Sequence, residues 1–384
     1  MSAVPLSVLD LVLISSGTDA ASSLQSSIEL AREADALGYR RFWTAEHHLF
    51  PGGAGAAGYL LGPIIARETK QIRVGTAVLV IDNYSPLQVA EIAGTIAALG
   101  GRGFDLGIGR GGPTVEQRAG ARETTRRLLA GELAPGPVGP NREEQGVVLP
   151  APTRSVFNDH RAGLNDRLLS RTPGAPADFD EQVRDVLAFL DGSYPSGDGS
   201  PVYAVPAHGA DVDLWVHGSS PGISATVAGS RGQRFGANYH NIPYSLLATV
   251  AAYREAFVPS AQLQAPYVVV SVDVLVAETD AEAERRAAPF GHWLLQSRRD
   301  YAAGPYPSPE EALAAPLTDE ERAIVSDRVA SRIVGSPQTV AARLRAIVDA
   351  TGADELVVTT SAHSLADRIE SYRLLAEVWG GAEG

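Results

Sequence analysis

Five consecutive residues, Thr44-Ala45-Glu46-His47-His48, are the part of this sequence best suited to chemistry. They directly follow the apolar stretch Tyr39 to Trp43, which is typical of a buried strand, so the cluster lies where a strand gives way to a loop. One carboxylate and two imidazoles can move protons near neutral pH, bind a metal, or hold a polar ligand. The same side chains can equally serve only to cap backbone groups of the loop, and at this point both interpretations are open.

Two further polar clusters follow apolar stretches that are typical of strands. In Gly109 to Gly112, glycine lets the backbone approach a ligand closely, and Arg110 offers a forked cation that suits phosphate. Gly218-Ser219-Ser220 precedes a predicted helix at Ile223 to Gly229, where hydroxyls and unpaired N–H groups converge. An arginine after one strand and a serine-rich helix start after the next are together what one bound phosphate requires.

His217 and His240 end two predicted strands and are further pocket candidates. The sequence contains no HExxH motif, so a zinc site would need Glu46 or a histidine pair together with distant partners. A metal-dependent barrel hydrolase that uses Glu46, His47 and His217 is therefore one alternative function.

The composition excludes several classes of partner and site. The formal net charge of −13 argues against nucleic acid and anionic membranes, since both need a basic surface. The 384 residues include no cysteine, which excludes disulfides, thiolate metal ligands and a cysteine nucleophile and fits a cytoplasmic location. The apolar stretch Val8 to Ile14 is too short to span a bilayer, and no signal peptide is expected.

Short apolar stretches alternate with longer helical patterns, which is typical of parallel βα units buried on both faces. Eight such strands predict an α/β fold, a (β/α)8 TIM barrel, in which the residues that follow each strand gather on one rim. The three polar clusters should therefore face one pocket. The expected strands are Leu6 to Ile14, Arg40 to Thr44, Ile72 to Ile81, Phe104 to Ile108, Leu214 to Val216, Arg234 to Asn238, Val268 to Ala277 and Glu355 to Thr360.

One barrel domain is expected over residues 1–384, with two excursions. The first, residues 111–213, follows the fourth strand, is rich in proline and glycine, and contains one predicted helix at Phe179 to Leu190. Its place predicts a lid over the catalytic mouth, although a passive insertion explains the same pattern. The second, residues 301–317, follows the helix after the seventh strand and is rich in proline and alanine.

Several strings of this sequence, in their order and spacing, resemble the bacterial luciferase-like flavin-dependent monooxygenase family. The resemblance spans most of the chain outside the two excursions and is more specific than any single motif. It rests on Arg41-Phe42-Trp43-Thr44-Ala45-Glu46-His47-His48, Ile72-Arg73-Val74-Gly75-Thr76-Ala77, Ser85-Pro86-Leu87-Gln88-Val89-Ala90-Glu91, Leu106-Gly107-Ile108-Gly109-Arg110-Gly111, Leu214-Trp215-Val216-His217-Gly218-Ser219-Ser220, Gly335-Ser336-Pro337 and Ala353-Asp354-Glu355-Leu356.

The resemblance implies a monooxygenase that takes reduced FMN from a separate flavin reductase and reacts it with O2 through a flavin C4a-hydroperoxide. The substrate would be a small organic molecule, and the Gly-Ser-Ser string suggests a secondary metabolite and natural product biosynthesis. Relatives are often homodimers through helices near the second and third strands. Within the same fold, an F420-dependent oxidoreductase and a non-catalytic flavin-binding protein are alternatives.

The same resemblance assigns roles to individual positions. His47 matches the catalytic histidine of the family, and Glu46 is expected beside the flavin. Ala77 and Val78 match a pair that lies against the isoalloxazine ring, commonly through a non-proline cis peptide bond.

The phosphate end of the flavin is expected at Arg110, Ser219 and Ser220, which agrees with the phosphate cluster inferred from residue types. Gly109 stands where luciferase itself has a reactive cysteine, so light emission does not follow. Asp82-Asn83-Tyr84 replaces the proline-containing turn that is usual after the third strand.

Overall fold

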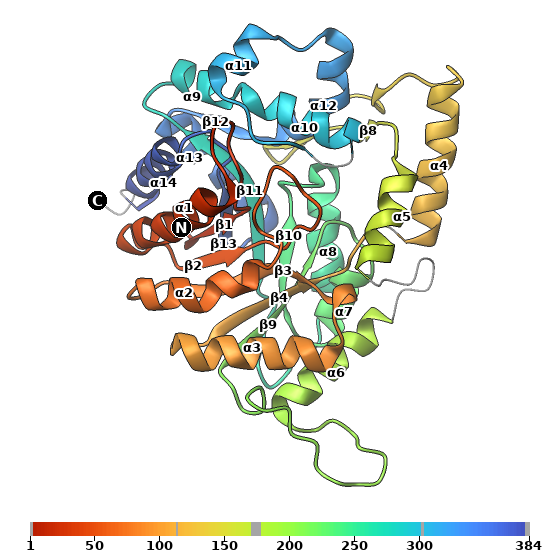
Figure 1. Ribbon diagram of the computed structural model, residues 1–384, viewed down its shortest axis with the longest axis vertical. Coiled ribbons are helices and arrows are strands. Elements are labelled where there is room, and N and C mark those ends of the chain that lie inside the picture. Colours follow the sequence, from red (N-terminus) through yellow and green to blue (C-terminus); the bar gives the residue numbers. More distant parts are fainter. Residues whose placement is uncertain (1–2, 113, 170–177, 301–302, 381–384) are drawn as a thin grey trace.

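A computed structural model describes residues 3–112, 114–169, 178–300 and 303–380 (Figure 1). Residues 113, 170–177 and 301–302, which belong to the two predicted excursions, lie outside the described residues. At the centre of the described chain, eight parallel strands form a closed barrel, with helices on its outer face. The predicted (β/α)8 barrel is therefore confirmed.

Each of the eight expected strands is present. Around the barrel they follow the order β1 (Leu6–Asp10), β2 (Arg41–Thr44), β3 (Arg73–Val80), β4 (Phe104–Gly109), β9 (Val212–Gly218), β10 (Arg234–Asn238), β11 (Val268–Val276) and β13 (Glu355–Thr359), and β13 pairs with β1. The pairing of β10 with β11, in which Phe235 lies opposite Val268, closes the barrel.

The first strand is shorter than predicted. It ends at Asp10 instead of Ile14, because the chain turns away at Val12, which has a φ of 50°. The amide of Ile14 then donates to the carbonyl of Gly52, and the amide of Ala54 donates to the carbonyl of Val12. This segment therefore pairs with the loop after β2.

Most helices connect one barrel strand to the next and cover the outside of the barrel. Local signals explain several of their starts: Asp19 and Ser85 each form a capping box with the residue three positions on. No helix within the described ranges has the length and apolar character needed to cross a membrane. The connecting helices are α1 (Ala20–Ala36), α2 (Leu61–Glu68), α3 (Pro86–Gly100), α7 (Ile223–Ser230), α8 (Leu246–Ala256), α9 (Asp280–Ala287), α13 (Pro337–Thr351) and α14 (Leu365–Gly380).

The two excursions contain secondary structure of their own. The first carries α4 (Val115–Leu129), the short strands β5 (Gly136–Pro137), β6 (Arg142–Glu144), β7 (Val147–Leu149) and β8 (Thr153–Arg154), then α5 (Asp159–Leu168) and α6 (Phe179–Asp191), the last of which was predicted. Helices α4 and α5 lie side by side at the right of Figure 1, where Arg118 forms a 2.8 Å ion pair with Asp166.

The second excursion belongs to a helical layer beside the barrel mouth. It contains α11 (Pro309–Ala314) and lies between α10 (Pro289–Asp300) and α12 (Asp319–Ser331), which is followed by the short strand β12 (Ile333–Gly335). These helices occupy the top of Figure 1. A hydrophobic cluster that includes Leu13, Phe290, Trp293, Tyr306 and Ile324 packs them against the loop after β1.

The barrel interior is layered, because alternate residues of a strand point to the same face. On β2 the inward residues are Arg41, Trp43 and, just beyond the strand, Ala45. Trp43 meets Trp215 edge to face, with ring centroids 5.3 Å apart. Ala45 and other residues at the carboxyl ends of the strands line an open cavity. The tryptophan layer thus separates the cavity from the closed end of the barrel.

A buried charge network fills that closed end. Arg41 donates through Nε to Asp105 Oδ2 over 2.9 Å and through Nη1 to Glu355 Oε2. Asp105 also accepts from the indole Nε1 of Trp215 over 3.0 Å. Both carboxylate side chains are fully buried, so each depends on its partners to offset the loss of hydration.

We predict that Arg41→Met lowers the free energy of unfolding by about 3–5 kcal/mol, because it leaves buried carboxylates without their central partner. Chemical denaturation measures this change. The matched control is Arg32→Met, which removes an ion pair to Glu68 between side chains that are 52% and 45% exposed, and which should cost at most about 1 kcal/mol. Equal losses in the two variants would contradict the structural role of Arg41.

Candidate functional site

A cavity of about 870 Å³ opens at the carboxyl ends of the barrel strands. All eight residues assigned to the site from the sequence line it: Glu46, His47, Ala77, Val78, Gly109, Arg110, Ser219 and Ser220. They come from the ends of β2, β3, β4 and β9 and from the loops that follow. A parallel barrel has such a rim because its strands all point the same way, and the three polar clusters therefore do meet in one pocket.

Glu46 acts as a hydrogen-bond hub between the loop after β2 and the end of β3 with its following turn. Its Oε1 accepts from Asn83 Nδ2 over 2.6 Å and lies 2.7 Å from His48 Nε2, while its Oε2 accepts from the backbone amide of Val80 over 3.0 Å. The carboxylate is buried. It therefore fixes the end of β3 and holds His48 in place.

The turn after β3 joins the same network. Asp82 accepts through Oδ2 from the amide of Gly111 over 2.8 Å, which fixes the loop after β4. Asn83 donates to Glu46 from the same turn. The polar residues that replace a proline-containing turn thus connect the loops after β2, β3 and β4.

The end of β3 departs from regular pairing. Its register with β4 shifts between Thr76 and Leu79, so Ala77 and Val78 leave the ladder, and the peptide bond between them is cis as the resemblance implied. Opposite them, a Cβ added to Gly109 would lie 3.1 Å from Val78 Cγ2. The bulge and the missing side chain give this wall of the cavity a surface of backbone and small apolar groups.

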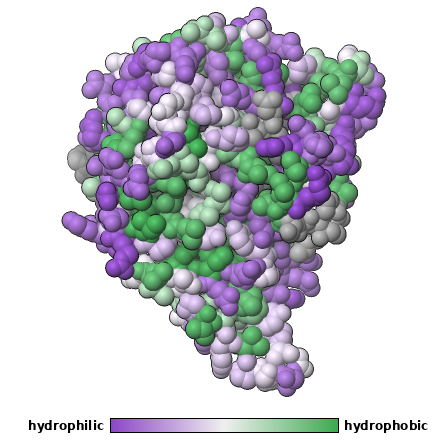
Figure 2. Space-filling view, viewed as in Figure 1, coloured by the Kyte–Doolittle hydropathy of each residue, from purple (hydrophilic) through white to green (hydrophobic). Residues whose placement is uncertain are grey.

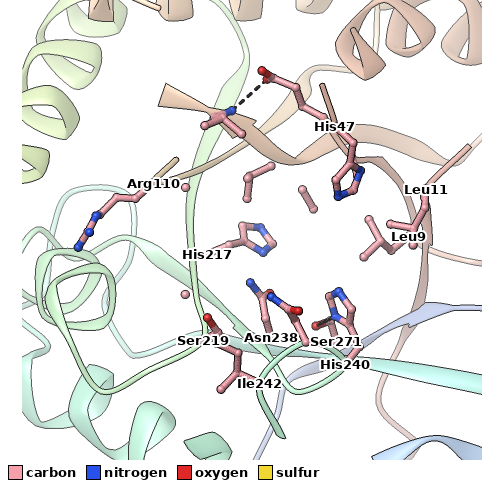
Figure 3. A pocket seen from close by; sticks show the side chains of 18 of the residues that line it. Leu9, Leu11, His47, Arg110, His217, Ser219, Asn238, His240, Ile242 and Ser271 are labelled. Carbon is pink, nitrogen blue, oxygen red and sulfur yellow. Dashed lines mark hydrogen bonds between the residues drawn. The ribbon is translucent and has the colours of Figure 1, made fainter. Parts of the chain in front are cut away.

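The imidazole of His47 points into the cavity (Figure 3). The side chain of His47 is exposed within the cavity, and its ring centroid lies 5.7 Å from that of Phe50. The protein around the cavity mouth reduces the hydration of the ring, and this, with a smaller contribution from the charge of His48, lowers the pKa of His47 below its usual value of 6.5. The ring is consequently neutral at pH 7 and can accept a proton.

Two more imidazoles, those of His217 and His240, face the same cavity (Figure 3). Burial lowers the pKa of His217 to about 4, and its Nε2 has no hydrogen-bond partner among the described residues. The Nδ1 of His240 lies 2.6 Å from Ser271 Oγ. Burial, and then the charge of Arg328, lower the pKa of His240 to about 3. All three rings are therefore neutral near pH 7.

Arg110, Ser219 and Ser220 form the polar side of the rim. Arg110 has no ion-pair partner in the part of the chain that the structure describes, and it lies across the pocket from Leu9 and Leu11 (Figure 3). Helix α7 begins at Ile223 after Gly222, and no described side chain caps it. A free guanidinium, hydroxyls and an uncapped helix start together fit a phosphate group.

Glycine is required beside this cluster. A Cβ added to Gly218 would lie 2.9 Å from the Cβ of Ser224, which is closer than side chains pack. Ser245 also donates through Oγ to the carbonyl of Ser219 over 2.5 Å and fixes the loop. The serines are thus held at the helix start by packing and by a neighbouring turn.

Several lining residues were not predicted. Asn238 and Ser271 point inward from β10 and β11, and strand alternation could have identified them. Trp293 on α10 and Arg328 on α12 also line the cavity. No local pattern marks these two, because only the docking of the helical layer brings them to the mouth.

The geometry gives no support to the metal hydrolase. Among the described residues, no group of three imidazole or carboxylate side chains is arranged to hold a metal ion. Glu46, which that hypothesis needs as a ligand, is surrounded by Asn83, His48 and the amide of Val80.

Comparison with known proteins identifies relatives along the whole chain. The sequence model of a family described as luciferase-like monooxygenase matches residues 4–131 and 172–355. A protein of Escherichia coli (strain K12) named luciferase-like monooxygenase is 28% identical over 376 residues, which cover 98% of this chain and 97% of the relative. The crystal structure of apo-MsnO8 is similar with a TM-score of 0.76 and 32% identity over 98% of each chain.

More distant structures share the fold. The oxygenating constituent of 3,6-diketocamphane monooxygenase from Pseudomonas putida, in complex with FMN, has a TM-score of 0.65 at 19% identity and covers 99% of this chain and 98% of its own. An F420-dependent secondary alcohol dehydrogenase has a TM-score of 0.57 at 14% identity, with 99% of each chain covered. Both cofactors therefore occur on this fold.

The neutral histidines make stability depend on pH. The pKa of His217 is 6.5 when unfolded and about 4 when folded, so the unfolded chain binds more protons between these values. The contribution of His217 to the free energy of unfolding is fully present above pH 6.5 and is lost as the pH falls towards 4. At pH 5 the loss is on the order of 2 kcal/mol.

Between pH 7 and pH 5, we predict that the free energy of unfolding falls by about 2 kcal/mol less in His217→Gln than in the parent chain. Urea denaturation at both pH values measures the difference. His160→Gln, which replaces an exposed histidine, should behave like the parent. An identical pH dependence in His217→Gln and the parent would refute the neutral, buried imidazole.

Proposed function

This chain belongs to the luciferase-like monooxygenase family, and from that premise we propose that it uses reduced FMN and O2 to oxygenate a small organic substrate. The observation that carries the proposal is the meeting, in one cavity, of a phosphate-binding cluster, a bulged backbone wall and a neutral histidine. A separate flavin reductase is the proposed source of the reduced FMN. F420, which fits the same fold, is the alternative cofactor, and a cytoplasmic location stays a prediction.

The residues present fit FMN at both of its ends. We place the phosphate at Arg110, Ser219 and Ser220, where a cation and hydroxyls have room for an anion. The flat ring would then lie along Ala77 and Val78, where the opposite residue lacks a side chain. Bound reduced FMN supplies the two electrons for the balanced reaction RH + O2 + FMNH2 → ROH + H2O + FMN.

In this reaction the protein handles protons and excludes water. His47 is neutral at pH 7 and projects into the cavity, so we assign it the role of proton acceptor at an imidazole nitrogen. Glu46 holds the loop that carries His47 close to the end of β3 and is a positioning residue. The apolar walls at Leu11, Trp293 and Leu294 keep bulk water from the reacting groups.

We propose that α4 and α5, within the 111–213 excursion, cover the cavity as a lid. Gln117 on α4 and Asn165 on α5 line the cavity. Helix α4 has no buried residue in its described length and is joined to α5 by ion pairs such as Arg118 with Asp166. Contacts of this kind break and reform more readily than an apolar core.

We further propose that the chain forms a homodimer through α2 and α3. Figure 2 shows apolar side chains gathered over these helices, and Leu60, Ile64 and Leu99 are 58%, 46% and 55% exposed. An apolar surface of this kind is typical of a subunit interface. Sedimentation equilibrium distinguishes the dimer from a monomer.

If Arg110 binds the phosphate of FMN, its replacement should weaken the binding of FMN and leave the binding of riboflavin unchanged. Arg110→Met should raise the Kd for reduced FMN about tenfold to a hundredfold, because a charge-assisted hydrogen bond contributes about 1.5–3 kcal/mol. Reduced riboflavin, which lacks the phosphate, should bind the parent and the variant equally. Anaerobic calorimetric titration measures both ligands, and an equal loss for the two would place the phosphate elsewhere.

The catalytic assignment predicts that His47→Ala lowers the rate of oxygenation about 10²- to 10⁴-fold, because the proton acceptor is lost. A library of small organic compounds is supplied with isotopically labelled O2, FMN, NADH and a flavin reductase, and mass spectrometry follows the uptake of one labelled oxygen atom. The control His208→Ala, which changes an exposed histidine that does not line the cavity, should keep the parent rate. If His47→Ala also keeps it, His47 is not the proton acceptor.

A further inference from the structure

Three arginines and two aspartates lie together where α12 approaches the cavity. Asp273 accepts through Oδ1 from Arg332 Nε over 2.9 Å, and both side chains are buried. Asp327 lies 2.8 Å from Arg298 Nη2. Each aspartate thus has its own arginine, and the third arginine, Arg328, is left in excess.

Arg328 has no carboxylate partner. Within the described part of the chain, no carboxylate oxygen lies within 4.0 Å of its guanidinium nitrogens, and its Nε is buried without a hydrogen-bond partner. Its Nη1 donates to the neutral amide oxygen of Asn241 over 3.1 Å. Burial lowers the pKa of Arg328 to about 10, with Arg298 adding to the effect, so the side chain is still a cation at pH 7.

The guanidinium also lies over the ring of Phe290, with 5.7 Å between its Cζ and the ring centroid. A cation with a buried, unpartnered Nε and no carboxylate partner is costly, and a bound anion would offset that cost. Arg328 lines the same cavity as the proposed flavin site. The positive charge of Arg328 lowers the pKa of His240. Asn241, which accepts a hydrogen bond from Arg328, follows His240 in the sequence. His240 and Arg110 lie on opposite sides of the pocket in Figure 3. Arg328 therefore gives the cavity a second cation, away from the proposed phosphate position.

The walls beside Arg328 are apolar. Trp293 and Leu294 from α10, and Leu11 and Phe50 from the loops after β1 and β2, line the cavity. Arg328 itself extends from α12, which packs against α10. A ligand that fills this side would carry one anionic group and an apolar body.

We propose that Arg328 binds the carboxylate of the substrate, so that the substrate class is an organic carboxylate with an apolar body. The planar guanidinium has donors left for a carboxylate after Asn241 takes one of them. This proposal rests on the function proposed above, because it fills the part of that cavity which the flavin leaves open.

The test uses octanoate as the probe and octanamide as its uncharged counterpart, titrated calorimetrically into the full chain without flavin. The parent should bind octanoate at least about tenfold more tightly than octanamide, because one interaction is charge-assisted. Arg328→Met and Arg328→Gln should remove this preference, and either variant suffices if the other does not fold.

Two controls locate the effect. Arg322→Met changes an arginine on the same helix that is 57% exposed, and Arg110→Met changes the cation on the other side of the pocket. Both should keep the preference for octanoate. The proposal is overturned if the parent shows no preference, if Arg328→Met and Arg328→Gln keep it, or if Arg110→Met removes it. Because flavin is absent, these outcomes do not depend on whether the chain binds FMN.

Discussion

Closure of the barrel between β10 and β11 is the constraint on which the candidate site depends. It sets which residues of each strand point inward, and that in turn sets three successive layers. At the closed end of the barrel, Arg41 binds Asp105 and Glu355. The next layer towards the carboxyl ends of the strands is the contact of Trp43 with Trp215, and the cavity opens beyond it. A shift of one residue in any strand would turn its inward side chains outward, so the charge network and the site depend on the same register.

The electrostatics of the cavity follow from this layering. The lowered pKa values of three imidazoles keep their rings neutral at pH 7, while two guanidiniums without a carboxylate partner, Arg110 and Arg328, line the cavity. A pocket with a neutral base and two cations favours ligands with negative charge at two places. The proposed flavin phosphate and substrate carboxylate would together satisfy that requirement, and this would leave His47 and the bulge at Ala77 and Val78 for the reacting groups.

The strands and the three polar clusters could be predicted from the sequence, because each depends on short stretches. A buried strand is an apolar stretch, and the rim follows from the common direction of parallel strands. Residues such as Glu46 and Ser219 could therefore be placed together before their contacts were known. The end of the first strand was predicted too late in the chain, because the turn at Val12 depends on pairing with a distant loop.

The contribution of the helical layer could not be predicted in the same way. In the sequence, Arg328 resembles any arginine on a polar helix. It lacks a carboxylate partner because the two nearby aspartates, Asp273 and Asp327, pair with Arg332 and Arg298. Likewise, Trp293 reaches the mouth only because α10 docks there. These positions depend on contacts between segments far apart in sequence, for which one sequence carries no local signal.

An anaerobic competition titration tests the proposal that this cavity binds reduced FMN. Reduced FMN and reduced F420 are each titrated into the full chain, and then each is titrated in the presence of the other. We expect reduced FMN to bind with one molecule per chain, and we expect that reduced F420 does not displace it. Binding of reduced F420 together with a failure to bind reduced FMN would contradict the proposed function.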